Sequence, residues 1–237
     1  MFKTLLLGLA AATLASTSQA SVTVSSYSMI DGANLYGAYD DNLYNGAHGP
    51  GGQLSGGTGD LTDGVTTALV AAGYGAWRPY VLWDGLSPVI TFDLGARFDL
   101  SGVRTYFKYF PAAAVYMPGS MGLRFSSDGV NFASSQLRTL LAAERLPGAN
   151  DSDGVFDVLT APATARYVEL TLNNGPENRW LALGEVVFDG VIASAPAGVP
   201  EPGAAALALL ALAGLGLTHR RAGSGGRWPA AGAVIRP

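Results

Sequence analysis

Few residues of this 237-residue chain could carry out acid–base or nucleophilic chemistry. The two histidines lie far apart, His48 in a glycine-rich stretch and His219 close to the C-terminal end. The chain has no cysteine, which excludes disulfides, thiol nucleophiles and thiolate metal sites. No serine–histidine–aspartate set and no histidine metal cluster can be assembled. The sequence therefore predicts a protein without catalytic activity.

Two pairs of neighbouring carboxylates remain, Asp40 with Asp41 and Asp151 with Asp153. Both pairs lie among glycine, asparagine and serine residues, which favour loops. An acid–base pair needs surroundings that push two pKa values apart, and exposed loops do not provide them. We interpret both pairs as solvated turns or weak cation sites.

Aromatic residues in the first third of the chain suggest a different chemistry, the binding of sugars. The apolar face of a sugar ring stacks on an aromatic ring, while its hydroxyl groups need polar partners. The alternative is that some of these rings, and those of Trp83 and Trp180, belong to the core or its rim. We predict a glycan-binding surface formed by Trp77, Arg78, Tyr80, Tyr36, Tyr39 and Tyr44.

The charge distribution argues against a nucleic-acid partner. Residues 21–198 contain nine lysines or arginines and seventeen acidic residues, and the remaining basic residues lie at the two ends of the chain. Nucleic-acid binding usually needs a basic face. An acidic middle is compatible with Ca²⁺, and it also aids solubility outside a cell.

The first twenty residues have the three parts of a secretory signal peptide. Lys3 supplies a positive start, and the apolar run that follows, residues 5–14, is too short to span a bilayer comfortably. Ser18-Gln19-Ala20 is a cleavage site of the small-x-small type. We expect residues 1–20 to form a signal helix that is removed on export across the inner membrane.

The other end of the chain carries three elements in order. A Pro-Glu-Pro motif precedes an apolar, helix-forming run at residues 203–217, and a pair of arginines follows. Positive charge after an apolar helix holds that end in the cytoplasm. This order resembles the PEP-CTERM sorting signal of Gram-negative bacteria over residues 199–221. The matching residues are Pro200, Glu201, Pro202, Arg220 and Arg221.

The resemblance to this sorting signal implies a partner and a location for the protein. The partner would be an exosortase, and the C-terminal hydrophobic helix would anchor the protein in the inner membrane before processing. The protein would then reach the cell surface or extracellular matrix. The chain departs from the pattern in two ways, since its apolar run is shorter than the ~20 residues of a full span and residues 222–237 continue beyond it. We expect this tail to be disordered and residues 191–198 to form a flexible linker.

The middle of the chain reads as an all-β domain. Short runs rich in valine, threonine, phenylalanine and tyrosine alternate with glycine, proline, asparagine and aspartate, as in sandwiches and barrels. Ser127-Asp128-Gly129 predicts a tight turn. Residues 31–64 contain ten glycines and little periodicity, and we expect them to wrap the domain, line a ligand site or be mobile. We predict strands at 22–27, 89–94, 102–109, 121–126, 155–159, 166–172 and 184–189.

Five segments of this region resemble a known family in their order and spacing. They resemble the discoidin domain, also called the coagulation-factor C-domain-like or galactose-binding-like fold. The resemblance implies a jelly-roll β-sandwich of about eight strands over residues 21–190, best supported over 61–190, with loops at one end that bind ligands. The five segments are 61–64, 89–95, 123–132, 165–170 and 180–190.

The same family resemblance implies a structural Ca²⁺. Sugar-binding relatives hold the ion with the aspartate of an Asp-Gly turn and a glutamate of the last strand, which match Asp63 and Glu185. Thr66 or Thr67 would add oxygen ligands, of which Ca²⁺ takes six to eight. The alternative is that Asp63 caps a turn and Glu185 forms an ion pair, because Val65 stands where relatives carry an acidic residue.

Together these patterns predict an exported, exosortase-sorted surface or matrix protein. Its domain would be a non-catalytic binding module for glycan, such as the exopolysaccharide of its own cell. The alternative is a structural envelope or matrix protein that binds no small ligand.

Overall fold

A computed structural model describes residues 20–33, 39–66, 79–133, 135–148, 151–177 and 179–194. The predicted signal helix up to residue 19, and the sorting motif, apolar helix and tail from residue 195 on, lie outside these residues. Within the described part of the chain, no helix is long and apolar enough to cross a membrane. The chain divides into the units Met1–Ala193 and Ser194–Pro237, and the fold below belongs to the first.

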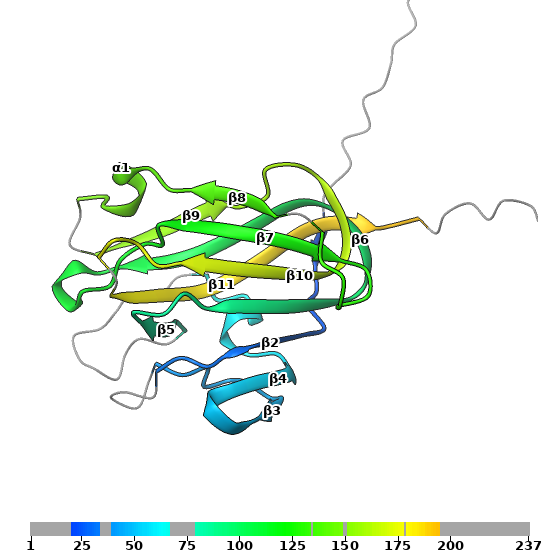
Figure 1. The fold of residues 1–237 in the computed structure, drawn as a ribbon, viewed down its shortest axis with the longest axis horizontal. Helices are drawn as coiled ribbons and strands as arrows, with labels where there is room; N and C mark the ends of the chain where they lie inside the picture. The colour runs from blue at the N-terminus through cyan, green and yellow to red at the C-terminus, as the bar shows by residue number, and fades with distance from the viewer. Residues whose placement is uncertain are drawn as a thin grey trace, which may run out of the picture. The chain divides into compact units, whose positions relative to one another are not determined.

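The described residues form strands joined by loops and a few single helical turns (Figure 1). The strands are β1 (Ala20–Val22), β2 (Ser26–Ile30), β3 (Ala47–His48), β4 (Gln53–Gly57), β5 (Val81–Asp84), β6 (Val89–Tyr109), β7 (Ser120–Ser126), β8 (Gln136–Thr139), β9 (Ser152–Asp157), β10 (Ala163–Asn173) and β11 (Trp180–Ile192). The helical turns are η1 (Pro50–Gly52), η2 (Asp60–Thr62), η3 (Pro111–Ala113) and α1 (Ala142–Arg145).

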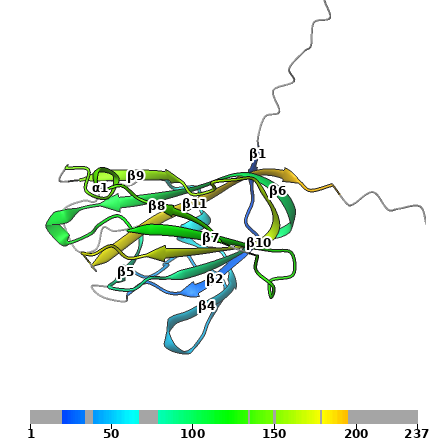
Figure 2. The ribbon, with the colours of Figure 1, turned by 45° about the horizontal axis from the view of Figure 1, so that its top comes forward.

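The strands form two layers that share β6. Its first half belongs to a layer with the order β3-β4-β2-β6-β10-β7-β8. Its second half pairs with β9 and β11, and β11 also pairs with β1 and β5. All of these pairings are antiparallel. Figures 1 and 2 show β6 curving from one layer into the other, which confirms the predicted all-β sandwich.

The curve of β6 starts at Gly95, between two runs that we predicted as separate strands. Gly95 has a φ of 77°. This left-handed conformation costs any residue with a Cβ atom roughly 1–2 kcal/mol. Asp93 fixes the bend, because its Oδ1 accepts hydrogen bonds from Gly95 N at 2.8 Å and from Arg166 Nε at 2.9 Å. The guanidinium of Arg166 also holds the pKa of Asp93 below its ordinary value. One continuous strand therefore serves both layers.

The apolar core fills the space between the layers. Alternate residues of β10 point into it, so Val168, Leu170 and Leu172 are fully buried, as the alternation in the sequence predicts. The predicted tight turn after β7 is also confirmed. Asp128 Oδ1 accepts hydrogen bonds from the N–H groups of Val130 and Asn131, and Gly129 has a φ of 77°.

Four strands, β3, β4, β5 and β8, were not predicted. Two of them lie in the glycine-rich stretch, where the glycines allow two backbones to approach closely. A Cβ atom on Gly46 would lie 2.6 Å from Ser55 O. The predicted linker is wrong at its start, because β11 continues through Ile192, which pairs with Phe98 of β6.

Candidate functional site

One end of the sandwich gathers the loops that join the two layers (Figure 1). The register pairs the last residues of β6 and β10 with the first residues of β9 and β7, so segments 110–119, 140–148 and 174–177 meet there. We call this surface the loop end. Tyr116 N donates to Trp180 O at 2.9 Å, and Trp180 N donates to Ala114 O at 3.2 Å. These bonds join the chain segments of two partly exposed aromatic residues, Tyr116 and Trp180, whose rings pack on different hydrophobic clusters.

A buried lysine lies beneath the same loop end. Lys108 of β6 is only 2% exposed. Its Nζ contacts Asp151 Oδ1 at 2.5 Å and Asp153 Oδ1 at 3.2 Å, and Tyr80 donates its O–H to the same oxygen of Asp153 at 3.2 Å. Both aspartate side chains remain about a third exposed, at 36% and 34%. Asp151 and Asp153 were interpreted as solvated turns or weak cation sites; both are exposed, but Asp153 belongs to β9 and both carboxylates bind the buried Lys108 ammonium.

Three of the tyrosines predicted to stack on sugar do not offer their faces to solvent. Tyr80 is 1% exposed and lies so close over Gly184 that a Cβ atom there would be 2.9 Å from its ring. Tyr44 is buried and donates its O–H to Tyr27 O at 2.6 Å, and Tyr39 is buried edge-on against Trp180. The prediction of a stacking role is wrong for these three, because each ring packs in a hydrophobic cluster. Tyr36, Trp77 and Arg78 lie outside the described residues.

The loop end presents two aromatic residues, Trp180 and Tyr116, that are not in the predicted glycan-binding set. Trp180 was interpreted as packing, and it does pack on a cluster that contains Tyr39 and Tyr80, yet it stays partly exposed. Tyr116 lies edge-on to Tyr109, with ring centroids 6.1 Å apart. Tyr109 is paired with Ser152, which lies between the two aspartates in the chain. No sequence pattern marks these rings, because their exposure depends on how loop 110–119 folds against β11.

The residues predicted to bind Ca²⁺ lie in one cleft of about 300 Å³. Asp63, Thr66 and Glu185 all line it, together with Thr62 and the chain of β1. Glu185 is 4% exposed, and its Oε2 accepts a hydrogen bond from Gly64 N at 3.2 Å. Burial, together with the nearby Asp63 charge, raises the pKa of Glu185 from 4.5 to about 8. The described residues hold no group of three or more acidic or histidine side chains around one point.

A second buried carboxylate joins the glycine-rich stretch to β2. Asp41 is 3% exposed and accepts the O–H of Tyr27 on Oδ2 and the N–H of Asp60 on Oδ1, the latter at 2.8 Å. Asp41 N in turn donates to Asp31 Oδ1 at 2.8 Å. Burial raises the pKa of Asp41, although the bonds from Tyr27 and Asp60 oppose this. The interpretation of Asp41 as a solvated turn residue is wrong, because it anchors the stretch in the fold.

Comparisons with known proteins give distant structural likenesses. No protein-family model matches the chain, and no curated protein does. The chain is similar to the C-terminal domain of a chitobiase from Bacteroides fragilis, with 17% identity, a TM-score of 0.41, and coverage of 58% of this chain and 83% of that one. It is similar to a Streptococcus pneumoniae fucose-binding module, with 11% identity, a TM-score of 0.40 and coverage of 73% and 97%.

A third similar structure is chitosan-binding module 1 of a chitosanase/glucanase from a Paenibacillus species. It shares 18% identity with a TM-score of 0.36, and the match covers 62% of this chain and 92% of that one. Likenesses this distant transfer neither a ligand nor a binding residue. The function therefore depends on the chain's own residues.

Proposed function

We propose that this protein is a non-catalytic glycan-binding module with its sugar site at the loop end. The observation that supports it is that two partly exposed aromatic residues, Tyr116 and Trp180, lie at the same end of the sandwich as two carboxylates bonded to buried Lys108. A fucose-binding module and a chitosan-binding module are among the similar structures named above. The proposal rests on this chain's own side chains and not on those likenesses.

The aromatic residues would supply the apolar half of the site. Sugar rings have an apolar face that loses water favourably when it packs on an aromatic ring. The backbone bonds between Tyr116 and Trp180 tie their two chain segments together before a ligand arrives. A site that is already ordered loses less conformational entropy when the ligand binds.

The aspartates would supply the polar half of the site. A carboxylate accepts several hydrogen bonds, and Lys108 contacts one oxygen, Oδ1, of each aspartate, Asp151 and Asp153. Sugar hydroxyl groups are suitable donors to such oxygens. Two carboxylates around one ammonium leave a net negative charge, which repels uronic acids and sulfated sugars. The ligand we expect is therefore a neutral glycan.

We also propose that the module works outside the cytoplasm, at the cell surface or in the extracellular matrix. The support is in the sequence: a signal-peptide pattern at residues 1–20 and the ordered sorting pattern at residues 199–221. Exosortase would then be the processing partner, with the inner membrane a transient one. Glycans of the cell's own matrix are the ligands available in that location.

A structural Ca²⁺ in the cleft between Asp63 and Glu185 is a further part of the proposal. Two carboxylates and the hydroxyl groups of Thr62 and Thr66 line one polar cleft, and hard oxygen donors of this kind suit Ca²⁺. Backbone carbonyls and water would complete the ligand set. The ion would join the turn at Asp63 to β11 and so stabilise the fold without taking part in sugar binding.

The loop-end proposal predicts which substitutions abolish sugar binding. We expect Trp180→Ala and Tyr116→Ala each to weaken binding to a neutral polysaccharide by about five- to thirtyfold, since stacking contributes ~1–2 kcal/mol. Asp151→Asn should weaken it less, because an amide still accepts one hydrogen bond. The measurement is affinity electrophoresis or calorimetry of the purified protein with a panel of neutral and acidic polysaccharides.

Phe132→Ala provides the matched control for this experiment. Phe132 is also a partly exposed aromatic residue, but it lies in the loop between β7 and β8 at the opposite end and packs under Arg124. This variant should bind like the wild type. Equal losses in all aromatic variants would contradict a loop-end site. No binding to any polysaccharide would favour the structural protein without a small ligand.

A further inference from the structure

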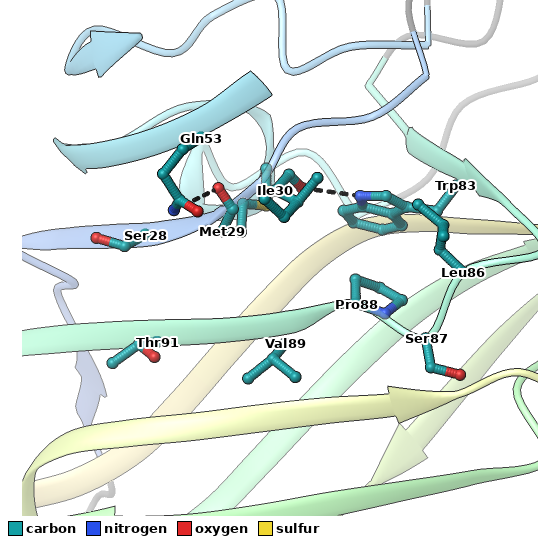
Figure 3. Close-up of a pocket in the computed structure, with 10 residues that line it drawn as sticks. All are labelled: Ser28, Met29, Ile30, Gln53, Trp83, Leu86, Ser87, Pro88, Val89 and Thr91. Atoms are coloured by element: carbon teal, nitrogen blue, oxygen red, sulfur yellow. Dashed lines mark hydrogen bonds between the residues drawn. The ribbon is translucent and has the colours of Figure 1, made fainter. Parts of the chain in front are cut away.

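The sheet contains a fork where β2 separates from β6. The two strands pair only at Ser26–Ser28 with Thr91–Asp93. The same register, continued by two residues, would place Ile30 opposite Val89. Beyond Ser28, however, β2 stays with β4, and the following chain bonds to β5 through Ala33 N and Leu82 O at 2.8 Å. A pocket of about 420 Å³ lies in the fork (Figure 3).

Trp83 occupies the hydrogen-bonding position that β6 would otherwise fill. Its ring is 0% exposed, and its Nε1–H donates to Ile30 O at 2.9 Å. Figure 3 shows Ile30 and Trp83 on one side of the pocket, with Pro88 and Val89 on the other. In an antiparallel ladder, the carbonyl of Ile30 would be the acceptor for Val89 N–H. The indole therefore replaces Val89 as the donor.

The main chain of Val89 is left as an open strand edge. Leu172 N donates to Pro88 O at 3.0 Å, so the polar groups of residue 88 face β10. Polar groups alternate sides along a strand, and those of Val89 must face β2. In the described residues, β2 pairs with β6 no further than Thr91. Val89 thus presents an N–H and a C=O to the pocket instead of to a neighbouring strand.

The walls of the fork match an uncharged, extended ligand. None of the ten residues that line the pocket is ionisable, although the domain is acidic overall. Ile30, Leu86 and Val89 line it and are about half exposed, at 44%, 51% and 45%. One wall is rigid, because Asn174 holds the turn before β6 through Ser87 Oγ at 3.0 Å and Leu86 O at 3.3 Å.

We infer that the fork binds an extended, uncharged peptide segment, which adds a short strand to the open edge of β6 at Val89. A peptide in the β conformation carries the alternating N–H and C=O groups that complete an open ladder, and its side chains meet the aliphatic walls. A sugar fits less well, because Trp83 is buried and offers no face for stacking. This binding mode is separate from the loop-end glycan site.

The first test follows the Val89 amide by hydrogen exchange in the full-length protein. In the free protein it should exchange much faster than the Ile90 amide, which faces β10. The probe is an array of blocked pentapeptides built from valine, threonine, serine and alanine, with charged pentapeptides for comparison. A bound uncharged peptide should slow Val89 exchange by at least about tenfold. A Val89 amide that is already protected in the free protein would overturn the inference.

Two variants distinguish strand addition from other contacts. Val89→Pro removes the N–H at a position with no ladder bond, so it should fold and lose peptide binding, whereas Val89→Thr keeps the N–H and should bind. Trp83→Phe frees Ile30 O to pair with Val89, so this variant should protect the Val89 amide without peptide. Peptide binding that survives Val89→Pro, or neutral glycan binding that Val89→Pro abolishes, would overturn the peptide assignment. Absence of binding across the array would do so as well.

Discussion

Without divalent cations, Glu185→Gln should be more stable than the wild type at alkaline pH, by about 2–4 kcal/mol near pH 9. The cause is the burial of Glu185 beside Asp63, which raises its pKa to about 8. An ionised Glu185 must give up water and face a second carboxylate. Glutamine keeps the shape of the side chain, and its oxygen can still accept the hydrogen bond from Gly64 N.

The direction of this pH effect follows from proton binding. The ordinary pKa of this group is 4.5, and the folded value is about 8. Between these values the folded protein binds a proton that the unfolded chain has lost. The stability linked to Glu185 is therefore complete below about pH 4.5 and is lost as the pH rises through about 8. Urea unfolding at several pH values with a chelator present would measure it, and equal pH slopes for both proteins would contradict the raised pKa.

Calcium adds a second, independent result in the same pair of proteins. Ca²⁺ competes with the proton, so millimolar Ca²⁺ should raise the wild-type melting midpoint more at pH 9 than at pH 5. Glu185→Gln and Asp63→Ala should lose most of this gain. If Ca²⁺ left the wild-type melting midpoint unchanged, or raised the midpoints of the variants equally, the calcium proposal would be wrong. The raised pKa of Glu185 would be unaffected by that result.

The sequence predicts the fold well wherever the alternation of apolar residues and the residue types of the turns indicate the same strands. The alternation around Val168 and the turn at Asp128–Gly129 both depend on neighbours close in the chain. The continuation of β6 through the bend at Gly95, and the short strands β3 and β4, depend on contacts made after folding. No local pattern shows that Gly46 must lie against the backbone of Ser55.

The residues of the candidate site also differ in how far the sequence predicts them. Asp63 and Glu185 could be brought together in advance only through the resemblance to a family, because 121 positions separate Gly64 from Glu185. The burial of Tyr80 could not be predicted from the sequence. It requires that Gly184, on a strand about a hundred residues later, leave room for the tyrosine ring. The burial of Lys108 also escapes prediction, because its two partners lie in a loop that reads as solvated.

Gly59→Ala should destabilise the protein by about 2–4 kcal/mol, a large loss for a single methyl group. The backbone of Gly59 is extended, with a φ of −168°, so alanine causes no strain of its own there. Its Cβ atom would lie 2.7 Å from the Tyr27 hydroxyl and closer still to Asp41 Oδ1. The methyl group must therefore push a buried carboxylate away from the donors that compensate for its burial.

Two further variants separate the steric clash from the loss of hydrogen bonds. Gly122→Ala lies in β7, where a Cβ atom would have no neighbour nearer than 3.8 Å, and should change stability by less than about 1 kcal/mol. Tyr27→Phe removes one donor to Asp41 without adding an atom, and should cost about 1–3 kcal/mol. Unfolding in urea measures all three. If Gly59→Ala were as mild as Gly122→Ala, the Asp41 network would be loose enough to rearrange, and its carboxylate could not be what holds the glycine-rich stretch against β2.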